Sequence, residues 1–327
     1  MRIAVDGMGG DFAPAAVVEG AAQAAAGWPD LELVVVGQAD QVQPLVERHP
    51  RIRFRPATQV IEMDEHPAQA VRAKTDSSMS VCARMCKQGE ADGWVSAGNS
   101  GGILAAALLI QGRIRGVERP ALGSVVPTRD GTAYFLDVGA NVDSRPEFLV
   151  QFAQMGSVYA RELMQRPHPR VGLLANGEED GKGDELVREV NARLRKDGNG
   201  LNFVGNVEPK EVFAGKADVV VADGFVGNVA IKMAEATADF LFRNLREEIP
   251  STVTGKVGGL LIRPGVQRIR SRIDWREFGG APLLGIDGVA VVAHGRSDAR
   301  AVKNAIRVAR DAIAARLVDK LRQAVGR

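Results

Sequence analysis

The sequence predicts a three-layer α/β/α protein built on a mostly parallel β-sheet, and two observations predict this class. First, short apolar runs alternate along the chain with longer segments whose apolar residues recur at helical spacing. Second, LELVVVG at 31–37 and ADVVVADG at 217–224 are nearly continuous apolar runs rich in β-branched residues, as in strands buried on both faces. We therefore expect helices on both faces of the sheet.

Each element follows from its own local pattern. The apolar runs predict strands at 2–5, 31–36, 93–97, 122–126, 133–137, 171–175, 202–205, 219–222 and 289–293. The helical patterns predict helices at 14–26, 39–48, 78–88, 101–112, 146–165, 184–197, 226–248 and 298–323. Because no low-complexity linker or fixed-period repeat interrupts this series, we expect residues 1–327 to form one domain.

One stretch, residues 251–285, departs from the alternation. Its apolar residues at helical spacing, its cations and a break at Pro264 predict a helical hairpin over 251–278 that projects from the domain. A basic amphipathic helix can bind an anionic membrane surface, although the same patch could receive an acidic carrier protein or pack within a dimer. The residues expected to make membrane or carrier contact are Leu260, Leu261, Ile262, Arg263 and Arg268.

Composition excludes several classes of protein. A net charge of +2 over 327 residues and an aromatic content of 5% argue against nucleic-acid binding. Cys82 and Cys86 are spaced for one helix face without a His cluster, so we expect neither a metal site nor a disulfide. The opening MRIAVDGMGGD predicts a strand and a turn rather than a signal peptide, and no apolar run approaches the ~18 residues of a membrane span. We expect a cytoplasmic protein.

Glycine occurs together with Asp, Asn or Ser after six predicted strands. The turns are DGMGGD at 6–11, SAGNSGG at 96–102, DVGANVD at 137–143, NGEEDGKGDE at 176–185, DGFVGN at 223–228 and AHGRSD at 293–298. In open α/β sheets, ligands bind beyond the carboxyl ends of the strands. Glycines let backbone N–H groups approach a ligand, and helix N-termini favour anions. The turns therefore predict an anion-binding site, and SAGNSGG before a helix is the best phosphate candidate.

Familiar catalytic motifs are missing. NGEEDGKGD has the wrong spacing for a P-loop, and no strand-linked G-x-G-x-x-G for a dinucleotide is present. The sequence also lacks a G-x-S-x-G nucleophile elbow, and His294 is the only histidine at a predicted strand end. This pattern indicates chemistry by positioning and electrostatics, without a cofactor or metal.

Together these turns resemble one family, the acyl-carrier-protein:phosphate acyltransferases of bacterial phospholipid synthesis (PlsX). DGMGGD is similar to the family's DAMGGD, and SAGNSGG is similar to its SAGNTGA. GEEDGKG fits the family's pattern G-x-E-x-x-K-G, and DGFVGN fits its pattern DGFxGN. DVGAN is identical to the family's motif. The resemblance extends from residue 1 to about residue 315. The departures are Gly7 in place of Ala, Ser100 in place of Thr, and Asn176 one position later than the usual Asn.

The resemblance implies a fold, a reaction and partners. The fold resembles that of isocitrate and isopropylmalate dehydrogenases and phosphotransacetylase. The implied reaction is attack of inorganic phosphate on a long-chain acyl thioester of acyl carrier protein, which yields acyl phosphate and free carrier. The family's members are dimers that touch the membrane surface, so we expect a homodimer bound peripherally to the inner face of the membrane.

Lys182 and Asp223 are the expected catalytic residues. Lys182 is the one cation of its turn and would stabilise the negative charge that develops on the thioester oxygen. The neighbouring acids would orient Lys182 and keep it protonated, although Asp184 could instead cap the next helix. Asp223 would orient phosphate or accept its proton. The other expected phosphate- or substrate-binding residues are Gly9, Gly10, Asp11, Arg72, Lys74, Asn99, Ser100, Gly101, Asn141, Asn228 and His294.

Two alternatives stay open beside this hypothesis. A phosphotransacetylase-like enzyme would use acyl-coenzyme A in place of the carrier protein. A non-catalytic scaffold at the membrane surface could use the same fold, but the intact turns around Lys182 and Asp223 argue against it. A dehydrogenase is disfavoured because the dinucleotide fingerprint is missing.

Overall fold

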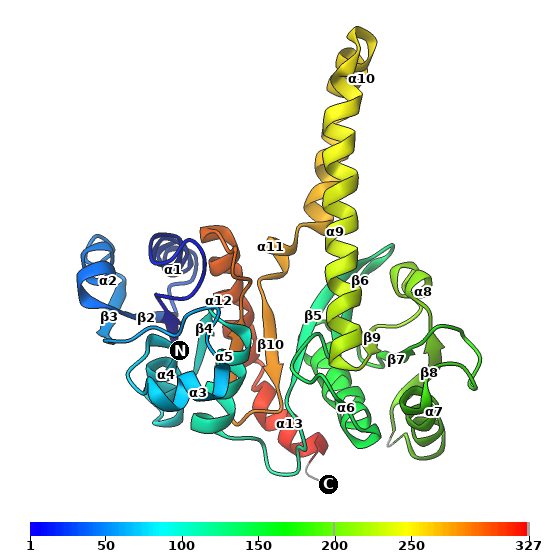
Figure 1. Ribbon diagram of the computed structural model, residues 1–327, viewed down its shortest axis with the longest axis horizontal. Coiled ribbons are helices and arrows are strands. Elements are labelled where there is room, and N and C mark those ends of the chain that lie inside the picture. Colours follow the sequence, from blue (N-terminus) through cyan, green and yellow to red (C-terminus); the bar gives the residue numbers. More distant parts are fainter. Residues whose placement is uncertain (199, 326–327) are drawn as a thin grey trace.

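One 11-stranded sheet runs through the computed structural model, which describes residues 1–198 and 200–325 (Figure 1). The strands are β1 Arg2–Asp6, β2 Glu32–Gly37, β3 Ile52–Pro56, β4 Gly93–Ser96, β5 Ala121–Thr128, β6 Gly131–Leu136, β7 Arg170–Leu174, β8 Asn202–Val207, β9 Val219–Val221, β10 Ala281–Leu284 and β11 Val289–Val292. Their order across the sheet is β3-β2-β1-β4-β11-β10-β5-β6-β9-β7-β8.

The sheet consists of two parallel halves joined by antiparallel strands. β10 pairs antiparallel with both β11 and β5, and β5 pairs antiparallel with β6. The other pairings are parallel. The predicted mostly parallel sheet is therefore confirmed, and its middle is the place where the strand direction reverses.

Helices cover both faces of the sheet and complete the three predicted layers. They are α1 Ala15–Gly27, α2 Ala39–Val46, α3 Pro67–Ala73, α4 Ser78–Lys87, α5 Ser100–Ala106, α6 Pro146–Glu162, α7 Glu185–Asp197, α8 Pro209–Ala214, α9 Gly224–Glu248, α10 Val253–Ile273, α11 Trp275–Phe278, α12 Ala299–Ala314 and α13 Leu317–Val325. A π-helical turn, Ala107–Gln111, follows α5, and a 3₁₀ turn, Ile249–Ser251, joins α9 to α10.

Some elements differ from the sequence prediction. The strands β3 and β10 were not predicted, because IRFRP alternates with charged residues and APLL is only four residues long. The predicted helix 298–323 is two helices, since Arg316 between them has a φ of +52° and cannot continue a right-handed helix. The predicted helix 101–112 changes to π-helical geometry after Ala106.

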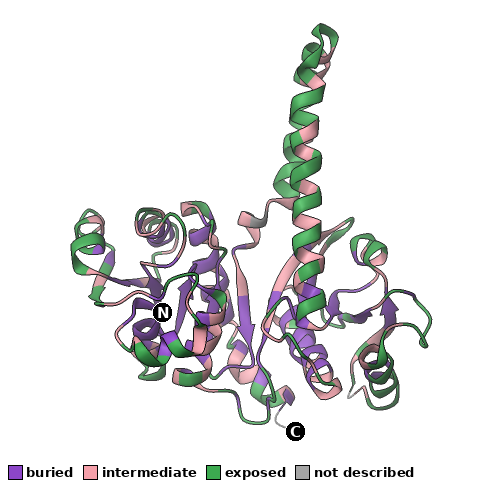
Figure 2. Ribbon diagram, viewed as in Figure 1, coloured by how far each residue is buried: buried purple, intermediate pink, exposed green. Residues whose placement is uncertain are grey.

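The largest difference concerns residues 251–278. We expected a complete hairpin there with a break at Pro264, but α10 continues through Pro264 as one 21-residue helix. The outgoing arm is α9, so the chain leaves the body along α9 and returns along α10 (Figure 1). Figure 2 shows that most of this projection is exposed, in contrast to the buried strands of the body.

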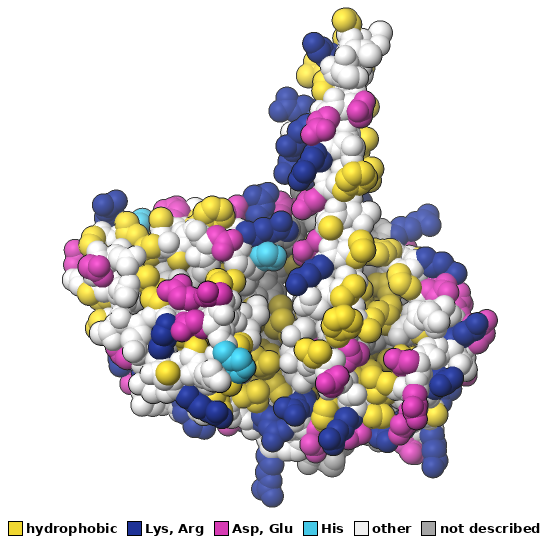
Figure 3. Space-filling view, viewed as in Figure 1, with side chains coloured by type: hydrophobic (Ala, Val, Ile, Leu, Met, Phe, Trp, Pro, Cys, Tyr) yellow, Lys and Arg dark blue, Asp and Glu magenta, His cyan; other side chains and the backbone are white. Residues whose placement is uncertain are grey.

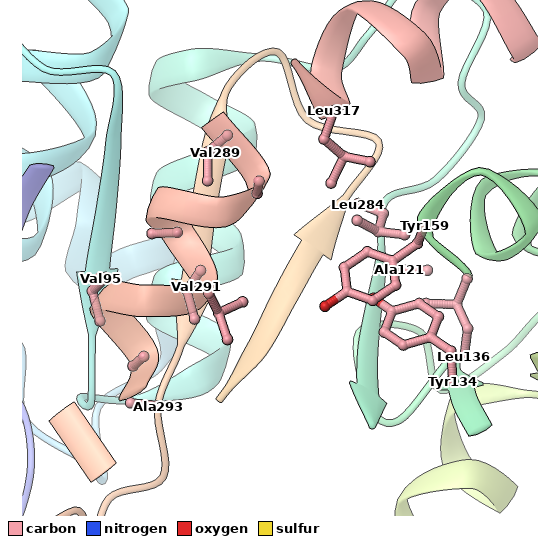
Figure 4. Packing of buried hydrophobic residues seen from close by; sticks show 14 of the residues in the cluster. Val95, Ala121, Tyr134, Leu136, Tyr159, Leu284, Val289, Val291, Ala293 and Leu317 are labelled. Atoms are coloured by element: carbon pink, nitrogen blue, oxygen red, sulfur yellow. The ribbon is translucent and has the colours of Figure 1, made fainter. Parts of the chain in front are cut away.

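A large apolar core joins the two halves of the sheet (Figure 4). The rings of Tyr134 and Tyr159 stack there with their centroids 3.8 Å apart. Gly123 on the neighbouring strand leaves room for this pair, because a Cβ at Gly123 would lie 2.0 Å from the Tyr134 hydroxyl oxygen. The strand-end turns thus extend from a rigid, close-packed base.

Candidate active site

The turns after β1 and β4 pack directly against each other. The Ser96 hydroxyl donates a hydrogen bond of 2.6 Å to the Asp6 carboxylate, and the Ser96 oxygen accepts one of 3.1 Å from the Gly98 N–H. Burial raises the pKa of Asp6. A Cβ at Gly9 would lie 2.6 Å from the Gly98 nitrogen, so the close approach of these turns requires glycine there. Gly9 is therefore a packing residue in this geometry.

The β1 turn also binds the turn after β11. The Asp11 N–H donates to the Gly295 oxygen at 2.8 Å, and Gly10 has a φ of +107°, which favours glycine. His294 lies beside this contact, and its Nδ1 accepts a hydrogen bond of 3.3 Å from the Arg296 N–H. Three of the predicted turns thus form one group.

The turns after β6 and β9 form a second group. The Asp137 carboxylate accepts hydrogen bonds from the N–H groups of Gly139, Ala140 and Asn141 at 2.8–3.1 Å. The Asn141 side-chain amide donates to the same carboxylate at 2.9 Å and to the Pro120 oxygen at 2.8 Å. Asn141 therefore fixes the shape of its own turn.

The N-terminus of α9 fits tightly onto this second group. A Cβ at Gly224 would lie 2.2 Å from the Asn141 oxygen, and one at Gly227 would lie 1.9 Å from the Asp137 oxygen. Asp223 is the N-cap of α9, where its carboxylate accepts from the N–H groups of Phe225 at 2.9 Å and Val226 at 3.3 Å. Asp223 is half-buried and so still reaches solvent on one side.

Lys182 lies exposed in the turn after β7. The acids of this turn pair with other cations: Glu178 with Lys216 at 3.2 Å, and Asp180 with Arg195 at 2.7 Å. Within residues 1–198 and 200–325, the expected ion pair between these acids and Lys182 is absent.

The polar groups of the same turn hold its backbone. Asp184 caps α7 by accepting from the Val187 N–H at 2.8 Å, as the alternative prediction had it. The Asn176 side chain accepts from the Gly183 N–H at 2.9 Å, and the Asn206 amide donates to the Glu179 oxygen at 2.8 Å. The turn is thus well supported while its lysine projects into solvent.

Several expected anion ligands have structural partners instead. Asn99 is buried, caps α5 through the Gly102 N–H at 3.0 Å, and donates to the Met63 oxygen at 3.0 Å. Lys74 binds the Glu65 carboxylate at 2.6 Å and the Val60 oxygen at 2.7 Å. Gly101 packs against Pro67, whereas Arg72 is exposed. Because Lys74 is already paired, the residues near 72–74 do not form an open binding site for an anion.

A cavity of about 1030 Å³ lies between the two groups of turns and extends along α9. Four of the predicted site residues line it, namely Asp11, Ser100, Asn228 and His294. Lys182, Asp223, Asn99 and Asn141 are not among its lining residues. In Figure 3 hydrophobic side chains gather beside the lower part of α9.

The sequence analysis missed three charged residues of this cavity, Lys232, Glu235 and Arg296. Arg296 lies 3.8 Å from the Glu235 carboxylate. Partial burial lowers the pKa of His294, and the positive charges of Arg296 and Lys232 lower it further, so the imidazole is mainly neutral at pH 7. The sequence did contain a signal for two of them, because Lys232 and Glu235 lie four and seven residues after Asn228, the last residue of DGFVGN, on one helix face.

Comparisons with known proteins show similarity over almost the whole chain. A family model described as "Fatty acid synthesis protein" matches residues 1–320. A phosphate acyltransferase of Desulfitobacterium hafniense is 47% identical over 100% of this chain and 98% of its own length. One from Clostridium perfringens is 44% identical over 99% of this chain and 97% of its own.

The chain belongs to the phosphate acyltransferase family. Solved structures of more distantly related proteins have the same fold as this chain. A phosphotransacetylase from Streptococcus pyogenes superimposes with a TM-score of 0.63 at 18% identity, covering 98% of this chain and 94% of its own. A 4-hydroxythreonine-4-phosphate dehydrogenase from Klebsiella pneumoniae gives 0.53 at 15% identity, with coverages of 95% and 98%.

Over residues 1–198 and 200–325, no helix combines the length and apolar character that crossing a membrane requires. The same residues contain no cluster of three or more His, Cys, Asp or Glu side chains placed to hold a metal ion.

Proposed function

We propose that the protein transfers a long-chain acyl group from acyl carrier protein to inorganic phosphate, for use in phospholipid synthesis. A phosphate oxygen attacks the thioester carbonyl carbon, the C–O bond forms, and the C–S bond breaks with the thiol leaving as free carrier. The observation that carries the proposal is the large cavity with a polar side at the strand ends, in a member of the phosphate acyltransferase family.

In this proposal Lys182 and Asp223 perform the catalytic roles. Lys182 is exposed on a long flexible side chain in a well-supported turn, which suits contact with a substrate carried on another protein. Asp223 stays half-buried at the helix start and orients phosphate or takes its proton. The lining residues Asp11, Ser100, Asn228 and His294 contact the reacting groups.

We further propose that the protein is a homodimer. The outer face of α9 presents the large apolar side chains of Phe225, Val229 and Phe240, which are 49–69% exposed. These positions recur at helical spacing on the side of α9 that faces away from the cavity. A second copy of the same helix would cover this stripe by a two-fold contact.

Exposed apolar side chains near the start of α10, at the far end of the projection, support peripheral binding to the inner face of the membrane. Val257, Leu260 and Leu261 on α10 are 60–76% exposed, and both leucines lie one turn after Val257 on the same face. Ile262, Arg263 and Arg268 lie near them, so apolar burial and attraction to anionic lipid would act together. We propose that α9 and α10 act as a hairpin for this contact, on a fold of the isocitrate/isopropylmalate dehydrogenase-like type.

Radiolabelled inorganic phosphate tests the reaction. The purified protein is incubated with labelled phosphate and palmitoyl-carrier protein, and the label that becomes extractable into organic solvent is counted and trapped with hydroxylamine. Label transfer with the carrier thioester supports the proposal. Transfer only with palmitoyl-coenzyme A would favour the phosphotransacetylase-like alternative, and no transfer with either thioester would favour a non-catalytic scaffold.

A further inference from the structure

The far side of the cavity is almost wholly apolar. It is formed where α9 crosses the hairpin of β5 and β6 and the helix α8. The apolar side chains on this side are Val125, Val126, Pro127, Phe135, Val212 and Phe213. Polar groups gather instead on the side of Asp11, Ser100, His294 and Arg296. The cavity therefore has one apolar end and one polar end.

Large apolar side chains in this cavity are left without cover. Phe213 is 47% exposed and Leu241 is 54% exposed, although both line the cavity. Exposed apolar surface of this size costs free energy in water and is typical of ligand-binding grooves. An apolar ligand that entered beneath α9 would cover both residues.

The size of the cavity fits an extended hydrocarbon chain. A methylene group is close in volume to a water molecule, about 30 Å³, so a chain of about 16 carbons needs roughly 500 Å³. The cavity of about 1030 Å³ has room for such a chain and for the polar group at its end. A short acyl group such as acetyl would leave most of the apolar surface uncovered.

We propose that this cavity holds the acyl chain of the substrate and that Ala234 and Ala238 set the chain length that fits. This inference rests on the proposed function. The thioester lies at the polar end, near Ser100 and His294, and the chain runs beneath α9 toward Phe213. Ala234 and Ala238 lie one helical turn apart, and both line the cavity. Their small side chains leave the space that a long chain occupies.

Filling this space should shorten the preferred substrate. Each methylene group that enters the cavity contributes about fourfold to kcat/KM, and a bulky side chain removes that contribution for the carbons it displaces. We expect Ala234→Phe and Ala238→Phe to lower kcat/KM for 16-carbon carrier thioesters at least tenfold. The value for 8-carbon thioesters should change less than twofold. Ala26→Phe, at an exposed position of α1 outside the cavity, is the matched control.

The experiment measures acyl phosphate formation by the full chain from carrier thioesters of 8 to 18 carbons. In parallel, the fluorescence of cis-parinaric acid, an 18-carbon probe, measures binding without phosphate or carrier protein. Weaker probe binding by the Ala234→Phe variant, with unchanged binding by the Ala26→Phe control, supports the cavity assignment. Circular dichroism and thermal unfolding check that each variant is folded.

Two outcomes would overturn the inference. One is a chain-length profile of the folded Ala234→Phe and Ala238→Phe variants that stays parallel to that of the unmodified protein. The other is a shift of these variants from dimer to monomer in sedimentation without a change in profile, which would assign the cavity to a subunit contact. If the unmodified protein binds the probe but transfers no acyl group, the proposed reaction fails and the cavity assignment stands.

Discussion

The side-chain amide of Asn228 donates a hydrogen bond of 2.8 Å to the backbone oxygen of Val138, and both residues line the same cavity. This contact joins the first turn of α9 to the loop after β6, 90 residues earlier in the chain. The loop after β6 and the DGFVGN turn therefore hold each other in place at the wall of the cavity.

We expect Asn228→Ala to lower the free energy of unfolding by about 1–3 kcal/mol, because the partly buried Val138 oxygen loses its partner. Acyl phosphate formation should fall as well, since the cavity wall loses a fixed contact. Urea unfolding and the labelled-phosphate assay measure the two effects. Asn244→Ala is the control, because Asn244 lies on the same helix and donates to the Phe240 oxygen in an exposed setting. Equal unfolding midpoints for the two variants would contradict the role given to Asn228.

Lys182→Ala should lower turnover by about a hundredfold or more, the usual effect of removing one group that stabilises a developing oxyanion. Because the Lys182 side chain is exposed, the variant should unfold at the same temperature as the unmodified protein. Lys196→Ala, an equally exposed lysine at the end of α7, serves as the control in the same steady-state assay. Near-native turnover by the Lys182→Ala variant would show that this lysine is not catalytic.

Asp223→Asn separates the charge of this residue from its structural role. Asparagine caps helices about as well as aspartate, so we expect the free energy of unfolding to change by less than ~1 kcal/mol. Turnover should fall by about a hundredfold, because the side chain can no longer accept a proton. The same exchange at the cap of α7, Asp184→Asn, is the control. A comparable loss in both variants would attribute the effect to capping instead of catalysis.

Ser100 and Asn99 should respond differently although they are neighbours. Ser100 is exposed and lines the cavity, so Ser100→Ala should raise the apparent KM for phosphate severalfold. The temperature of unfolding should stay the same. Asn99 is buried and ties α5 to the loop at 62–65, so Asn99→Ala should cost about 1–3 kcal/mol of stability. Phosphate saturation curves and thermal unfolding distinguish the two effects. An unchanged apparent KM for phosphate after Ser100→Ala would exclude that residue from the phosphate site.

The double variant Leu260→Glu with Leu261→Glu should abolish co-sedimentation with vesicles of anionic phospholipid. Both side chains are exposed on α10, and two carboxylates there would oppose apolar burial and add repulsion from the lipid. Activity on soluble carrier thioesters should persist. Leu109→Glu, an exposed leucine at the end of the α5 segment, is the control. Vesicle binding that survives the double change would refute membrane contact by this helix, and a monomeric, inactive double variant would indicate packing between subunits.

The sequence by itself determined the layers of the fold and the places where function could lie. Strand and helix periodicities are local, so β2 and β9 were visible in the runs LELVVVG and ADVVVADG. Glycine beside Asp or Asn also signals a turn locally, and parallel strands bring such turns to one edge. The resemblance to phosphate acyltransferases was visible in the same turns, and the comparisons confirm that family.

Only the tertiary structure decided what each polar side chain in those turns does. Asn99 and Asp223 both begin helices as N-caps, whereas Asn228 and His294 line the cavity. Lys74 binds Glu65, a pairing that depends on how two segments fold together. Pro264 predicted a break, but one missing hydrogen bond did not end a 21-residue helix. The cavity itself joins residues from Asp11 to Ala301, so it depends on long-range packing that local spacing does not encode.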